Sequence, residues 1–216
     1  METSKEKVLE LVATGKISAA EGSELLGALV KPGPSIWSRL GNPFERLNGM
    51  ATWSLTVVAV LIGFLLFKWN VRFDGALDVH STHNGLPEVA LWDQIVAWPL
   101  TALVFWLTSR AVGQKGRVSD FLGAVGVARI PLVLIGILIG GLGPRARIDT
   151  SSPSIGAVAL VLGVLPLVAW AVVLLLNGFR NASGLREGKS TRVFFVALVV
   201  AEILSKVVLH IMEVRK

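Results

Sequence analysis

The chain of 216 residues is 53% hydrophobic and 17% charged, with a formal net charge of +6. Soluble globular proteins carry about 25% charged residues, so this composition indicates a membrane protein and excludes the disordered and fibrous classes. The chain contains no cysteine, which excludes disulfides, thiol nucleophiles and thiolate metal sites.

The excess of positive charge lies in the apolar part of the chain. Residues 1–50 contain six Lys or Arg and six acidic residues, whereas residues 51–216 contain fifteen and nine. Basic residues between apolar runs are typical of loops that face anionic lipid, and these are too scattered to follow the phosphates of a nucleic acid. We therefore expect membrane lipid, and no nucleic acid, among the partners.

Residues 1–34 are predicted to form a small cytoplasmic helical hairpin. Residues 3–6 and 18–21 each have the Ser/Thr-x-x-Glu spacing of a capping box, and Gly15 separates the two helices. Helices of about ten residues are too short to be stable alone, so their apolar stripes must pack on something. We assign partner binding to six stripe residues: Val8, Leu9, Val12, Leu25, Leu26 and Leu29.

The remainder of the chain is expected to lie on and in the membrane. Residues 35–50 have the pattern of an interfacial linker on the cytoplasmic surface. A membrane span needs about 20 apolar residues of helix, and five segments meet that requirement. They are about residues 51–69, 90–109, 119–142, 155–177 and 193–212, with residues 213–216 as an external tail. The predicted fold is an all-α, polytopic bundle of five transmembrane helices.

The distribution of Lys and Arg predicts the orientation. Thirteen of them lie in the N-terminal segment and the loops on its side of the membrane, against six on the other side. Because positive loops stay in the cytoplasm, we expect a cytoplasmic N-terminus and an external C-terminus.

Four charged residues and one histidine lie within the predicted spans: Asp93, Arg129, Glu202, Lys206 and His210. Each charge costs about 2.5–3.5 kcal/mol on insertion scales, so these side chains should face the bundle interior and pair. Depths counted at about 1.5 Å per residue pair Arg129 with Glu202, and Lys206 with Asp93. This intramembrane polar seam either fixes helix register or binds a proton, an ion or a lipid headgroup.

Two further patterns bear on helix packing and on metal binding. Gly136 and Gly140 have the small-xxx-small spacing that permits close helix approach, either inside one chain or between two copies. His80 and His83 lie three residues apart, with Asp74 and Asp78 upstream. They are weak candidates for a zinc site, but a solvated loop is the favoured interpretation, and we expect no metal and no cofactor.

Two stretches carry a resemblance to a known family. The sequence RVSDFLGAVGVARIP (residues 117–131) is similar to the third span of bacterial members of the Yip family, membrane proteins named for their interaction with Rab-type GTPases. The sequence NVRFDGALDVH (residues 70–80) is similar to their first external loop, and residues 5–30 resemble short helical hairpins appended to bacterial membrane proteins. The resemblance covers about residues 45–212. It implies a membrane scaffold or adaptor in a bacterial inner membrane.

No Gly-x-Ser-x-Gly, His-Glu-x-x-His or Walker-type sequence occurs, so we expect no enzymatic activity. The predicted function is that of an integral membrane scaffold or adaptor that binds a protein partner, or a second copy of itself, through the hairpin. The alternative is a small transporter or lipid-binding protein that uses the polar seam.

Overall fold

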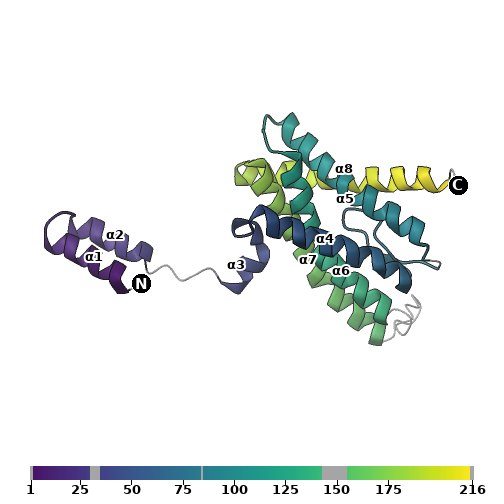
Figure 1. Cartoon of the computed structure of the whole chain (residues 1–216), viewed down its shortest axis with the longest axis horizontal. Helices are drawn as coiled ribbons and strands as arrows, with labels where there is room; N and C mark the ends of the chain where they lie inside the picture. Colours follow the sequence, from purple (N-terminus) through teal and green to yellow (C-terminus); the bar gives the residue numbers. More distant parts are fainter. Residues whose placement is uncertain (1, 30–34, 84, 143–154, 215–216) are drawn as a thin grey trace. The chain divides into compact units, whose positions relative to one another are not determined.

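A computed structural model describes residues 2–29, 35–83, 85–142 and 155–214. The chain divides into two compact units, Met1–Leu40 and Gly41–Lys216. The first unit contains α1 (Glu2–Ala13), α2 (Ala19–Leu29) and most of α3 (Ile36–Gly41) (Figure 1).

The helices α1 and α2 pack against each other as a hairpin. A glycine turn at Gly15, with φ +68°, reverses the chain. Gly22 of α2 lies against Val12 of α1, where a Cβ atom would approach Val12 Cγ2 to 2.2 Å. The second predicted capping box is confirmed, because the Ser18 amide donates to Glu21 Oε2 at 2.8 Å and the Glu21 amide donates to Ser18 Oγ at 3.2 Å.

In its described residues, the second unit contains five helices that are long and apolar enough to cross a membrane, as predicted. A short helix η1 (Pro43–Glu45) precedes them. The spans are formed by α4 (Gly49–Leu65) with its continuation η2 (Leu66–Trp69), α5 (Pro87–Ala111), α6 (Val118–Leu142), α7 (Ile155–Ser183) and α8 (Glu187–Val214). The helices α5, α7 and α8 extend beyond the predicted spans by several residues.

The helix α6 lies at the centre of this unit and contacts α4, α5 and α7 (Figure 1). In its most apolar window 67% of the residues are buried, against 22% in α4 and in α7. Small residues permit the close contact with α4: the Thr56 hydroxyl lies on Gly126 and donates to the Gly123 carbonyl at 3.2 Å. Four buried phenylalanines fill the space between α5, α6, α7 and α8, namely Phe105, Phe121, Phe179 and Phe194.

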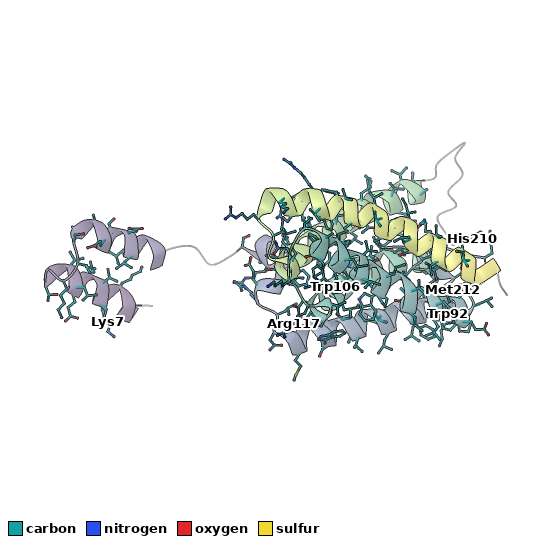
Figure 2. All side chains as sticks on the ribbon, turned by 90° about the horizontal axis from the view of Figure 1, so that it is seen from above. Lys7, Trp92, Trp106, Arg117, His210 and Met212 are labelled. Carbon is teal, nitrogen blue, oxygen red and sulfur yellow. The ribbon has the colours of Figure 1, made fainter. Side chains whose placement is uncertain are left out.

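The outward faces of the spans are apolar. Exposed side chains on α4, α7 and α8 include Val57, Leu61, Leu162, Leu165, Val196 and Val199. A soluble protein rarely exposes so large an apolar surface, whereas lipid solvates it. Figure 2 places Trp92 and His210 at one end of the unit and Trp106 and Arg117 toward the other, so that α5 and α8 run antiparallel.

A short β-ribbon between η2 and α5 was not predicted. The strands β1 (Val71–Arg72) and β2 (His80–Ser81) pair antiparallel, with Arg72 opposite His80. Asn70 adopts a left-handed conformation, with φ 56°, and its side chain accepts a hydrogen bond from the Gly85 amide at 2.8 Å. We call residues 70–83 the ribbon loop.

The predicted glycine pair packs against this region of the same chain. A Cβ atom on Gly136 would lie 2.8 Å from Leu66 Cδ1, and one on Gly140 would lie 2.8 Å from Trp69 Cβ. The two glycines of α6 therefore make room for η2 and β1 of the same chain.

Candidate functional site

The ribbon loop folds back onto α8, where one carboxylate holds its backbone. Glu202 Oε2 accepts hydrogen bonds from the Ala76 amide at 2.8 Å and the Leu77 amide at 3.1 Å. Gly75 makes this approach possible, because a Cβ atom at that position would lie 2.3 Å from Glu202 Oε1. Hydrogen bonds to an ionised carboxylate are among the stronger ones in proteins, so Glu202 anchors the loop to the last helix.

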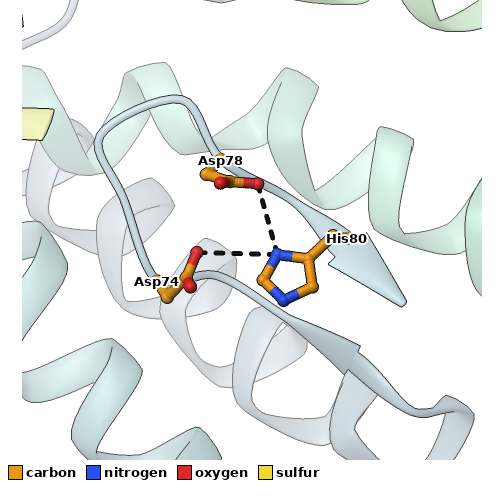
Figure 3. A group of neighbouring side chains, drawn as sticks. All are labelled: Asp74, Asp78 and His80. Carbon is orange, nitrogen blue, oxygen red and sulfur yellow. Dashed lines mark hydrogen bonds and ion pairs between the residues drawn. The ribbon is translucent and has the colours of Figure 1, made fainter. Parts of the chain in front are cut away.

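Two carboxylates of the loop meet one imidazole (Figure 3). Because Arg72 pairs with His80 in the ribbon, Asp74 and Asp78 occupy equivalent places on its two arms and face each other. His80 Nδ1 lies 3.2 Å from Asp78 Oδ1 and 3.6 Å from Asp74 Oδ1. Both neighbours can only accept, so we place a proton on Nδ1. The Lys206 ammonium of α8 donates to the other oxygen of Asp78, Oδ2.

These contacts shift the protonation of all three groups. The hydrogen bond from His80 lowers the pKa of Asp78 to about 2, with burial opposing it. The same hydrogen bond raises the pKa of His80 above its usual value, again against burial. Burial raises the pKa of Asp74, and the attraction of His80 offsets only part of that effect. These shifts favour the charged forms of His80 and Asp78 and the neutral form of Asp74.

A second ionic group is built on Arg72, which lies opposite His80 in the ribbon. Arg72 Nε and Nη2 donate to the two oxygens of Asp93 at 3.1 and 2.9 Å, and the Asp93 side chain is only 1% exposed. Arg129 of α6 is 2% exposed and its guanidinium carbon lies 5.6 Å from the centre of the Phe73 ring. Its Nη2 atom is buried without a hydrogen-bond partner. Arg129 lies close enough to Asp93 to interact with it through space.

The predicted pairing within the seam is wrong. Asp93 pairs with Arg72 rather than Lys206, and Glu202 holds loop amides and lies 3.7 Å from Lys206 rather than pairing with Arg129. Counting depth along the spans omitted the ribbon loop, which supplies Arg72, Asp78 and two backbone amides. The five seam residues are thus divided: Asp93 and Arg129 form one group, Glu202 and Lys206 serve the loop, and His210 is exposed one turn farther along α8.

The structure also separates the other predicted site residues. Among the described residues, His80 groups with Asp74 and Asp78, and His83 is not part of that group. In the hairpin, Val8 is buried and Val12 and Leu26 are half-buried, whereas Leu9 and Leu25 are 55% and 45% exposed. The side chain of Leu29 lies outside the described residues. Among the stripe residues whose side chains the structure describes, Leu9 and Leu25 are the exposed ones.

Two hollows occur away from the ionic groups. One of about 260 Å³ lies where α6 begins, and its lining includes Thr52, Asp120 and Asn181. The other, of about 290 Å³, is an apolar depression between the end of α5 and the start of α8. Neither is lined by residues of the ribbon loop, Asp93 or Arg129, and both are at or below the usual lower size for small-molecule sites.

The five apolar helices and the loop anchored between them define a polytopic α-helical membrane protein. A family model of the Yip1 domain matches residues 26–209, so the chain belongs to the Yip1 domain family. The match includes the first four spans, most of α8 and the ribbon loop, and leaves α1 and most of α2 outside it. No curated protein and no solved structure matches the chain.

Proposed function

We propose that the chain is an integral membrane scaffold of the Yip type that binds a protein partner through its N-terminal hairpin and catalyses no reaction. The observation that carries the proposal is the hairpin itself. It belongs to a compact unit of its own, begins before the family match, and exposes Leu9 and Leu25 while burying Val8.

The proposed orientation places the hairpin in the cytoplasm and the C-terminus outside, in a bacterial inner membrane. The thirteen-to-six distribution of Lys and Arg supports it. An odd number of spans puts the two ends of the chain on opposite sides. The ribbon loop, between the first and second spans, is then external.

The test of the adaptor role compares partners recovered with the intact hairpin and with an altered one. The protein is extracted from its native membrane in lipid discs, and bound proteins are identified by mass spectrometry. Full burial of one leucine side chain contributes about 1.5–3 kcal/mol, so replacing two half-exposed leucines should remove about 2 kcal/mol, or more than a tenfold change in affinity. We expect a stoichiometric partner with the wild type and its loss from the Leu9→Ser, Leu25→Ser double variant.

Ser23→Thr, at an exposed position of α2, is the matched control and should retain the partner. Recovery of the same proteins from the double variant and from a chain lacking residues 1–34 contradicts the proposal. Recovery of a second copy of the chain, lost in the double variant, shows self-association through the hairpin instead.

One observation favours the alternative of a transporter or lipid-binding protein: the buried Nη2 of Arg129 lacks a hydrogen-bond partner, and an anionic ligand supplies one. This function predicts that a chain lacking residues 1–34 stays active and that Arg129→Ala does not. The adaptor role predicts the reverse.

A further inference from the structure

We propose that Asp74, Asp78 and His80 bind one divalent transition-metal ion of the zinc class at the turn of the ribbon loop (Figure 3). The site lies outside the hairpin and outside the spans, so it is independent of the proposed adaptor function. It departs from the expectation, stated from the sequence, that this loop holds no metal.

The spacing of the donor atoms fits such an ion. Zinc binds imidazole nitrogen and carboxylate oxygen at about 2.0–2.2 Å in tetrahedral geometry, which separates neighbouring donors by about 3.3–3.6 Å. His80 Nδ1 lies 3.2 Å from Asp78 Oδ1 and 3.6 Å from Asp74 Oδ1. One donor atom from each of the three residues lies within 4.8 Å of the other two, so a small closure of the two carboxylates completes one face of a tetrahedron.

Each donor atom can bind the ion once His80 Nδ1 releases its proton. Asp78 binds Lys206 through Oδ2, which leaves Oδ1 directed at the imidazole. Asp74 Oδ1 is buried and has no hydrogen-bond partner, so a metal ion would satisfy an atom that the protein leaves unsatisfied. The His80 side chain is 41% exposed, which gives the ion access from solvent and leaves the fourth position for water.

The loop is held in the required shape before any ion binds. The β1–β2 register fixes the two arms, and Glu202 fixes Ala76 and Leu77 at the turn between the aspartates. A ligand set on an ordered loop loses little conformational entropy on binding. Two aspartates and one histidine favour zinc, manganese, iron or cobalt, whereas calcium and magnesium prefer oxygen ligands alone.

The experiment titrates Zn²⁺ into the purified full-length chain, without a polyhistidine tag and after treatment with a chelator, in competition with a chromophoric zinc chelator. We expect one tightly bound Zn²⁺ per chain. In His80→Gln and in Asp74→Asn the affinity should fall at least tenfold. His83→Gln removes a histidine from the same loop but not from the site, so it should bind as the wild type does. Binding by His80→Gln equal to the wild type, or an equal loss in His83→Gln, overturns the proposal.

A second measurement needs no variant and therefore covers the case in which a substitution prevents folding. X-ray absorption at the zinc edge of the loaded wild type should show one imidazole with oxygen ligands. The absence of stoichiometric zinc, or a ligand set with two or more imidazoles, contradicts the site.

Discussion

The Glu202 carboxylate lies in an apolar helix, yet it accepts hydrogen bonds from the backbone of a loop that is distant in the sequence. Glu202→Gln keeps the shape of the side chain, but it removes the negative charge and replaces one of the two acceptor oxygens. Hydrogen bonds to charged groups contribute about 1.5–3 kcal/mol, so we expect the loop to lose about 2 kcal/mol of local stability. Hydrogen exchange of the Ala76 and Leu77 amides should accelerate, while His210→Gln, at an exposed position on the same helix, should leave it unchanged.

The buried charges around Asp93 contribute unequally to the stability of the folded protein. Removing one partner of a buried ion pair costs about 3–5 kcal/mol because the other charge is left uncompensated. Asp93→Asn leaves both Arg72 and Arg129 without their carboxylate, whereas Arg129→Met leaves the Arg72–Asp93 pair intact. We expect thermal unfolding in detergent to show a large loss for Asp93→Asn and little or none for Arg129→Met. Equal losses would mean that Arg129 is an obligatory member of the pair.

Glu21 gives the hairpin a predictable dependence on pH. Hydrogen bonds from the Ser18 backbone amide and hydroxyl lower its pKa below the ordinary 4.5. A carboxylate whose pKa is lowered by folding stabilises the folded state at any pH above its ordinary pKa. That stabilisation is lost as the pH falls through the pKa of the folded state. The start of α2, followed through the Ser18 amide resonance in the full chain, should therefore loosen below about pH 4.5. In Glu21→Gln the same resonance should show no such titration.

Sequence patterns predicted those helices whose formation depends on a single segment of the chain. The five spans follow from the length of each apolar run, and the hairpin follows from two capping boxes and Gly15. The ribbon loop was not predicted, because two strands of two residues are too short for an alternating pattern to stand out. The partners of Asp93 and Glu202 could not be predicted either, since they depend on the backbone path of residues 70–77. The sequence did contain one indication. A loop that only connects two spans has no need of an arginine and a glycine, yet this loop contains Arg72 and Gly75.

The glycines of α6 permit a prediction for that helix. At Gly136 an added methyl group would lie 2.8 Å from Leu66 and 3.0 Å from Phe73. Overpacking of this kind costs about 1–3 kcal/mol, so Gly136→Ala should lower the unfolding temperature without changing the oligomeric state. Gly163→Ala on α7, whose nearest neighbour would be 4.0 Å away, is the control. A change of oligomeric state in Gly136→Ala alone would favour a contact between two chains.

For the whole molecule, five spans place the two ends of the chain on opposite sides of the membrane. The chain contains no cysteine, so single cysteines can be introduced without a background. We expect Thr82→Cys in the ribbon loop to react with a membrane-impermeant maleimide from outside intact cells. Lys115→Cys, between α5 and α6, should react only after the cells are opened. The opposite result inverts the orientation.

The link between the ribbon loop and α8 also constrains how the protein is made. Arg72 precedes Asp93 by 21 residues, so the second span meets its counter-charge as soon as it leaves the ribosome. The amides of Ala76 and Leu77 have no carboxylate acceptor until Glu202 is synthesised, 125 residues or more later. Chains are synthesised at about 5–20 residues per second, so the loop is without its anchor for about 6–25 seconds. Truncated nascent chains that end before α8 should therefore expose the loop to proteases, and completion of the last helix should close it.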